Sequence, residues 1–148
     1  MNNTGQSCNA PTRMLIPADK MDEAINISKE TVLKLKVGDP QDESISMGPV
    51  VNKNQFSKIK EYISKGIEEG ATLVTGREET IKDNEMGYFI NPTIFANVTK
   101  DMTISKEEIF GPVLSIIGYH SEEEAIDIAN DSIYGCLLYT SDAADERR

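Results

Sequence analysis

The stretch that decides the fold reads Asn3-Thr4-Gly5-Gln6-Ser7-Cys8-Asn9-Ala10-Pro11-Thr12-Arg13 and places one cysteine among small and polar residues. Gly5 can adopt backbone angles that other residues avoid, so the chain can turn sharply just before the thiol. A helical turn that begins near Gly5 would offer unpaired N–H groups, which favour a thiolate and can hold an oxyanion. The pattern therefore makes Cys8 a candidate nucleophile. A buried small side chain or an unreactive thiol is the alternative for a single cysteine.

A second motif follows later in the chain and reads Lys106-Glu107-Glu108-Ile109-Phe110-Gly111-Pro112-Val113. Together the two stretches resemble the nucleophile segment and the Glu-Glu-Ile-Phe-Gly-Pro segment of the NAD(P)-dependent aldehyde dehydrogenase superfamily. The resemblance runs from Asn2 to about Gly135. It implies an α/β fold with an open, mostly parallel sheet flanked by helices. Residues 1–135 are therefore expected to be a partial aldehyde dehydrogenase catalytic domain, incomplete at both ends.

The resemblance implies a reaction that starts at Cys8. Its thiolate would attack the carbonyl of a small aldehyde, and hydride transfer to NAD or NADP would leave a thioester. Water would then release a carboxylic acid, with coenzyme A as the alternative acyl acceptor. The Cys8 backbone N–H and a side-chain amide from elsewhere in the family's fold would hold the oxyanion. Gln6 and Asn9 flank the thiol and are expected to position the loop, and Arg13 is expected to anchor the structure.

Four residues match cofactor-binding positions of the family. Glu108 would accept hydrogen bonds from the nicotinamide ribose hydroxyls, because its two carboxylate oxygens can do so in parallel. Phe110 would pack beside the nicotinamide. Gln55 and Lys58 match a helix that approaches the adenine-side ribose. A surface glutamate, a core aromatic residue and solvated helix residues are the respective alternatives.

The resemblance also implies residues that this sequence does not contain. The general base of the family lies in a Glu-Leu-Gly-Gly-Lys segment upstream of the nucleophile, and losing a general base costs roughly 10²–10⁴-fold in rate. The oxyanion asparagine and the glycine-rich cofactor half are also outside the sequence. We therefore expect the chain alone to be inactive, poorly folded and marked by exposed apolar patches. A non-catalytic relic or interaction module is the alternative function, and an unrelated thiol hydrolase would need His120 as its base.

The composition restricts the kinds of partner and site that we expect for this protein. The 148 residues carry a formal net charge of −10, which disfavours nucleic acid and anionic membranes as partners. No apolar run is long enough to span a membrane and no signal peptide precedes the first motif, so we expect a cytoplasmic protein. Cys8, Cys136 and the single His120 lack the spacing of metal ligands, so no metal site is expected. For the full-length protein the resemblance implies a homodimer or homotetramer.

Local patterns predict the order strand, helix, helix, strand, strand, strand, helix, which is typical of α/β layering. The predicted strands are 13–17, 71–75, 88–95 and 113–119, and the predicted helices are 19–36, 52–70 and 121–130. Asn52 and Ser121 have the spacing of N-caps for two of these helices. Pro92 cannot donate to a strand ladder, so its strand is expected at a sheet edge or at a bulge. Residues 77–87 are predicted to form an exposed loop, and a short helix is predicted before Glu108.

The end of the chain departs from the resemblance. The family pattern continues through Tyr134 and Gly135, but we find no counterpart after Leu137. Our hypothesis is that residues 136–148 form an atypical tail translated from a frameshift, a cloning junction or a sequencing adapter. A natural disordered tail is the alternative.

Overall fold

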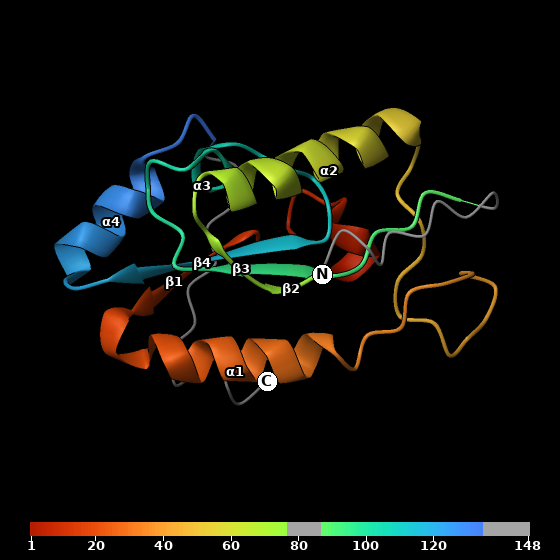
Figure 1. Cartoon of the computed structure of the whole chain (residues 1–148), viewed down its shortest axis with the longest axis horizontal. Helices are drawn as coiled ribbons and strands as arrows, with labels where there is room; N and C mark the ends of the chain where they lie inside the picture. Colours follow the sequence, from red (N-terminus) through yellow and green to blue (C-terminus); the bar gives the residue numbers. More distant parts are fainter. Residues whose placement is uncertain (77–86, 135–148) are drawn as a thin grey trace.

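A four-stranded sheet, in the order β1-β4-β3-β2, forms the centre of the molecule (Figure 1). The computed structural model describes residues 1–76 and 87–134. The strands are β1 (Arg13–Pro17), β2 (Thr72–Thr75), β3 (Thr93–Ala96) and β4 (Val113–Tyr119). Strands β1, β4 and β3 run parallel, and β2 pairs antiparallel with β3. The expected α/β fold with a mostly parallel sheet is confirmed.

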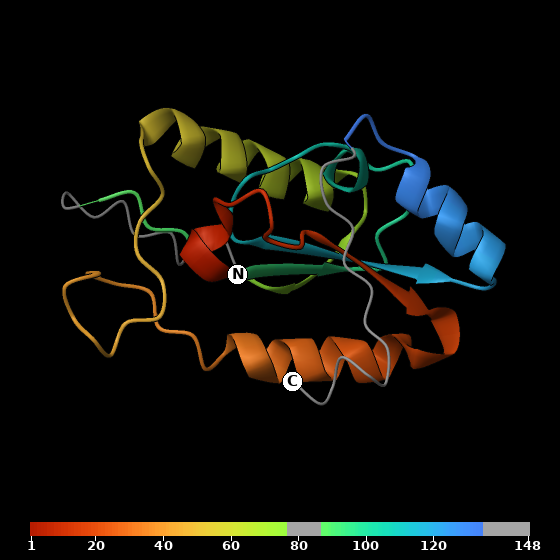
Figure 2. The same ribbon diagram turned by 180° about the vertical axis from the view of Figure 1, so that it is seen from behind.

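Helices cover both faces of this sheet (Figures 1 and 2). Helix α1 lies along one face, and α2, α3 and α4 lie on the other. The helices are α1 (Met21–Val32), α2 (Lys53–Glu68), α3 (Thr103–Lys106) and α4 (Glu122–Asn130), with 3-10 turns η1 (Asn2–Gly5) and η2 (Ala18–Lys20). Both predicted N-caps form, because Asn52 accepts from the Gln55 N–H at 2.9 Å and Ser121 from the Glu124 N–H at 3.2 Å.

The main core lies between α2 and the sheet. The apolar stripe of α2 buries Phe56, Ile59 and Ile63, which are spaced to lie on one side of a helix. They pack with Phe95 of β3 and Ile117 of β4 in a single buried cluster. Burying each such side chain stabilises the fold by roughly 1.5–3 kcal/mol, so α2 is firmly attached to the sheet.

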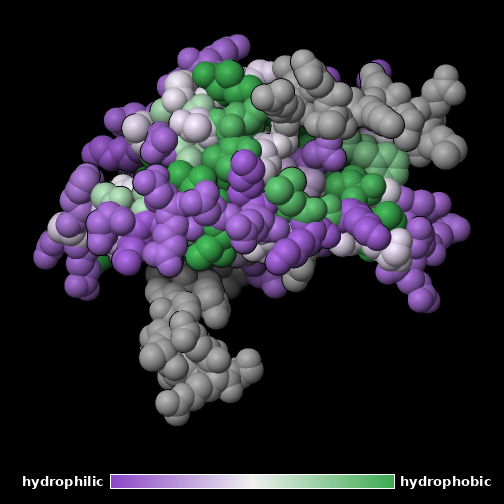
Figure 3. Space-filling view, turned by 60° about the horizontal axis from the view of Figure 1, so that its bottom comes forward, coloured by the Kyte–Doolittle hydropathy of each residue, from purple (hydrophilic) through white to green (hydrophobic). Residues whose placement is uncertain are grey.

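The opposite face of the sheet is covered by α1. Side chains alternate along a strand, so Ile94 and Ile116 point away from the main core and toward α1. No residue of α1 within its described span is fully buried. Figure 3, which turns the α1 side of the molecule toward the viewer, shows hydrophobic residues lying between hydrophilic ones on this surface.

Three local predictions are corrected. The predicted strand at 88–95 is short, because only Thr93–Ala96 forms β3. The edge position expected from Pro92 is wrong: β3 lies inside the sheet, and Pro92 directly precedes it, so its missing N–H removes no ladder bond. The pairing irregularity lies instead on β2, between Leu73 and Thr75. The predicted helix at 19–36 is a 3-10 turn followed by α1, which ends at Val32.

Two other predictions fall largely outside the described residues. They are the exposed loop at 77–87, apart from residue 87, and the atypical tail at 136–148. The interpretation of that tail stays a prediction.

Candidate active site

The two motifs meet because of how β1 and β4 pair. The strands are parallel neighbours with Arg13 opposite Ser115, so the segments that lead into them lie at the same end of the sheet. The cysteine stretch leads into β1, and the Glu108 motif leads into β4. The Ser115 N–H donates to the Thr12 carbonyl at 2.8 Å, which extends the pairing toward the cysteine. Figure 2 shows the N-terminal segment beside the segment that enters β4, below α2.

Two glycines make the contact between the motifs. Gly5 has φ +72°, which confirms the sharp turn expected before the thiol. A Cβ atom at Gly5 would lie 2.0 Å from the Gly111 carbonyl oxygen, so no side chain fits there. A Cβ atom at Gly111 would in turn lie 2.5 Å from Cδ1 of Ile59. The cysteine loop, the Glu108 motif and α2 therefore form one closely packed stack.

The cysteine loop is also tied to the segment before α2. The Thr4 hydroxyl donates to the Gly48 carbonyl at 3.1 Å, and the Val51 N–H donates to the Gln6 side-chain oxygen at 2.8 Å. The Ser7 hydroxyl donates to Asn9 Oδ1 at 2.5 Å. Gln6 and Asn9 thus position the loop, as expected from the sequence.

Cys8 is a free, exposed cysteine, and not a buried small side chain. It lies within a single turn that is closed by the Ala10 N–H donating to the Ser7 carbonyl at 2.9 Å. The helical turn expected to begin near Gly5 is not present, since η1 ends there. Its exposure makes the thiol accessible from solution.

Arg13 anchors the loop to the rest of the fold. Its guanidinium donates to the Ile128 carbonyl at 3.0 Å and to the Ala129 carbonyl at 3.1 Å, in the last turn of α4. Carbonyls in the last turn of a helix are incompletely paired within the helix, and a cation is favourable at a helix C-terminus. The prediction that Arg13 anchors structure is confirmed.

The Glu108 side chain is exposed, and its backbone is held by α2. The Lys58 ammonium donates to the Glu108 carbonyl at 3.2 Å. The Gln55 amide donates to the carbonyls of Ile109 and Phe110, both at 2.9 Å. Phe110 is half-buried and has φ +55°, a left-handed conformation that is uncommon for a residue with a side chain. The structure thus brings the four predicted cofactor-binding residues together, while their roles in binding stay predictions.

The sequence reasoning missed a further pair at this place. The Tyr62 hydroxyl donates to Glu107 Oε2 at 2.5 Å. This hydrogen bond, together with burial and the negative charge of Glu107, raises the pKa of Tyr62 to about 12. Tyr62 lies one helical turn after Lys58, whose ammonium is 5.5 Å from the centre of the tyrosine ring. In the sequence, the spacing of Lys58 and Tyr62 on the predicted helix was the only feature that placed Tyr62 near the predicted site residues.

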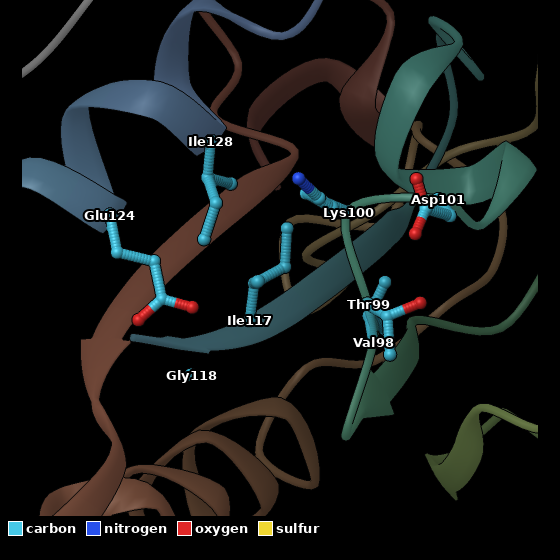
Figure 4. A pocket seen from close by; sticks show the side chains of 8 residues that line it. All are labelled: Val98, Thr99, Lys100, Asp101, Ile117, Gly118, Glu124 and Ile128. Atoms are coloured by element: carbon cyan, nitrogen blue, oxygen red, sulfur yellow. The ribbon is translucent and has the colours of Figure 1, made fainter. Parts of the chain in front are cut away.

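A hollow of about 290 Å³ lies at the other end of β4, away from both motifs (Figure 4). Glu124 and Ile128 of α4 line one side, and the loop at 98–101 lines the other. It contains none of the predicted site residues. Within residues 1–76 and 87–134 no group of three metal-ligating side chains comes together. No helix in this described part is both long and apolar enough to cross a membrane.

Comparison with known proteins agrees with these motifs. The model of the aldehyde dehydrogenase family matches residues 1–145. A putative aldehyde dehydrogenase of Staphylococcus haemolyticus is 51% identical over 139 residues, which cover 94% of this chain and 29% of that protein. A 3-succinoylsemialdehyde-pyridine dehydrogenase of Pseudomonas is 47% identical over 147 residues, covering 99% of this chain and 31% of that protein. The chain thus spans less than a third of the length of these relatives.

Solved structures give the same result. A mutant of aldehyde dehydrogenase C from Pseudomonas syringae, in complex with NAD+ and octanal, superposes with a TM-score of 0.84 at 43% identity, covering 89% of this chain and 27% of that one. An aldehyde dehydrogenase of Mycobacterium tuberculosis in complex with NAD+ superposes with a TM-score of 0.82 at 48% identity, again covering 89% of this chain and 27% of that one. With both motifs meeting at one end of the sheet and this similarity along nearly its whole length, the chain belongs to the aldehyde dehydrogenase family.

Proposed function

We propose that this chain is part of an NAD(P)-dependent aldehyde dehydrogenase and carries its nucleophile, Cys8, and its ribose-binding residue, Glu108. The observation that supports this most is the backbone contact between Gly5 and Gly111. The contact keeps the cysteine loop beside the Glu108 motif. Such a reaction needs this proximity, because the substrate carbon must lie next to the hydride acceptor when hydride moves.

The described residues fit a nicotinamide ribose. The Glu108 carboxylate is exposed and can accept from two neighbouring hydroxyls, while its own backbone is held by Lys58. The half-buried Phe110 lies two residues further on and offers an aromatic surface for a nicotinamide ring. The P. syringae and M. tuberculosis relatives, both solved with NAD+, support this assignment.

In the proposed reaction Cys8 does the covalent chemistry. Its thiolate attacks the aldehyde carbon, a C–S bond forms, and the carbonyl electron pair moves to the oxygen. The Cys8 backbone N–H donates to this oxyanion and stabilises it. Bound NAD(P) supplies a two-electron acceptor for the hydride that leaves the carbon as the carbonyl re-forms. Water then cleaves the thioester, the carboxylic acid departs, and Cys8 is regenerated.

The test uses the full-length protein that carries this chain. The Cys8→Ala variant should lose roughly 10³-fold or more of its aldehyde-dependent reduction of NAD+ or NADP+, as removal of a nucleophile does in other enzymes. Ser57→Ala, an exposed change on α2, is the control and should keep wild-type activity. Retained activity in Cys8→Ala would exclude Cys8 as the nucleophile. A wild-type protein with no turnover on any aldehyde would favour the non-catalytic alternative.

A further inference from the structure

One face of α2 holds the segment around Glu108 at several points. Gln55, Lys58, Ile59 and Tyr62 are spaced by three and four residues, so they lie along the same side of the helix. Each of them contacts the segment 107–111: Gln55 and Lys58 bind backbone carbonyls, Ile59 lies against Gly111, and Tyr62 binds the Glu107 carboxylate. The conformation of this segment is therefore set by α2.

The Tyr62 contact bears directly on where the Glu108 side chain points. Glu107 has an extended backbone, with φ −109° and ψ 146°. Consecutive side chains on an extended backbone point to opposite sides. Because Tyr62 draws the Glu107 carboxylate toward α2, the Glu108 carboxylate is turned to the other side, where it is exposed.

The other end of the segment is held just as closely. The left-handed backbone of Phe110 is unfavourable for a residue with a Cβ atom, so surrounding contacts must maintain it. Both N–H donors of the Gln55 amide are used for this purpose, on the carbonyls of Ile109 and Phe110. Glu108 thus lies between two fixed points, one at Glu107 and one at Phe110.

We propose that Tyr62 is a positioning residue for Glu108, acting through the hydrogen bond to Glu107, with Gln55 fixing the opposite end. The inference rests on the proposed function, in which Glu108 binds the nicotinamide ribose. The raised pKa of Tyr62 has this hydrogen bond to Glu107 as its largest cause, as expected for a phenol that donates to a carboxylate. Tyr62 itself touches neither substrate nor cofactor in this proposal.

The test is Tyr62→Phe in the full-length protein, which removes the hydroxyl and keeps the ring. The KM for the cofactor should rise about 2- to 5-fold, the effect of one exposed charge-assisted hydrogen bond, while kcat stays within about 2-fold. Tyr119→Phe, at the far end of β4, is the matched control and should change neither constant. Glu107→Gln should raise the same KM, and the double variant should be no worse than the poorer single one, because the two residues act through one contact.

The outcomes separate this inference from the proposed function. The key comparison is Glu108→Gln, which should raise the cofactor KM more than Tyr62→Phe does. If Glu108→Gln raises it and Tyr62→Phe leaves it unchanged, the positioning role of Tyr62 is wrong and the role of Glu108 stands. If Glu108→Gln itself has no effect, the ribose-binding role fails and the inference fails with it. Additive effects of Tyr62→Phe and Glu107→Gln would also overturn the proposed route through Glu107.

Discussion

Helices α2 and α1 lie on opposite faces of the same sheet and are attached to it very differently. Helix α2 buries Phe56, Ile59, Ile63 and Gly66. Helix α1 has no fully buried residue, and at its solvent side Ile27 is 58% exposed. Both helices are amphipathic, so a hydrophobic stripe alone does not determine how firmly a helix is held.

The difference follows from what each helix contacts. The apolar side of α2 meets the core, and its neighbouring polar side chains bind the segment 107–111. Helix α1 lies along the face of the sheet that carries Ile94 and Ile116, and its own inward side chains are only partly buried. The helix that builds the core is therefore also the helix that arranges the candidate site.

The largest expected effect comes from truncating matched isoleucines on the two helices. Ile63→Ala should lower the stability of α2 and the sheet by about 3 kcal/mol, because Ile63 is fully buried and leaves a cavity. Ile25→Ala should cost only about 1 kcal/mol, since Ile25 of α1 is only partly buried. Amide hydrogen exchange measures the opening free energy of each helix separately. Equal losses for the two variants would contradict the difference in attachment.

A smaller effect is expected from two glycines, Gly111 just before β4 and Gly118 within it. A Cβ atom at Gly111 would lie 2.5 Å from Cδ1 of Ile59, so Gly111→Ala should cost roughly 1–3 kcal/mol through overpacking against α2. At Gly118 the nearest atom is the end of the flexible Met21 side chain, at 2.9 Å, so Gly118→Ala on the α1 side should cost less than about 0.5 kcal/mol. Exchange of the β4 amides checks both values. A larger loss of stability for Gly118→Ala than for Gly111→Ala would contradict the closer packing on the α2 side.

The smallest effect concerns the polar side of α2 and depends on pH. The fold raises the Tyr62 pKa from 10.0 to about 12, so it favours the neutral phenol. The resulting contribution to the free energy of unfolding is fully present below pH 10.0 and is lost as the pH rises to about 12. Its size should stay below about 1 kcal/mol, because solvent screens the pair.

Absorbance titration of the tyrosines tests this directly. Tyr62→Phe should remove the component that titrates near pH 12, and Glu107→Gln should move that component toward lower pH. The difference in thermal midpoint between the wild type and Tyr62→Phe should shrink over the same interval. An unchanged titration curve in Glu107→Gln would show that the Glu107 contact does not raise the pKa.

Elements with strong local signals could be predicted from the sequence. Strand β4 has the predicted bounds, and α2 begins at its predicted N-cap, because an apolar run and a capping side chain act over a few residues. The edge position predicted from Pro92 is wrong, because a proline removes a ladder hydrogen bond only when it lies inside a strand, and Pro92 lies just before β3. Where β3 begins depends on its tertiary pairing with β4, which starts at Thr93.

The residues of the candidate site also divide into those that local sequence predicts and those that depend on distant contacts. Cys8 and Glu108 could be named because short motifs surround each of them. Tyr62 could not, because its partner Glu107 lies 45 residues further along the chain and becomes a neighbour only in the folded state. The hydrogen bonds from Gln55 to the carbonyls of Ile109 and Phe110 could not be predicted for the same reason.

The parallel pairing of Arg13 with Ser115 has a consequence for how the site is assembled. Contacts between residues so far apart in sequence form slowly, because the intervening chain must first lose its freedom. Helix α2 can form early from local contacts, whereas the cysteine loop and the Glu108 motif meet only when β1 joins β4. During synthesis the cysteine loop therefore emerges well before the Glu108 motif, and Gly5 has no packing partner until β1 joins β4.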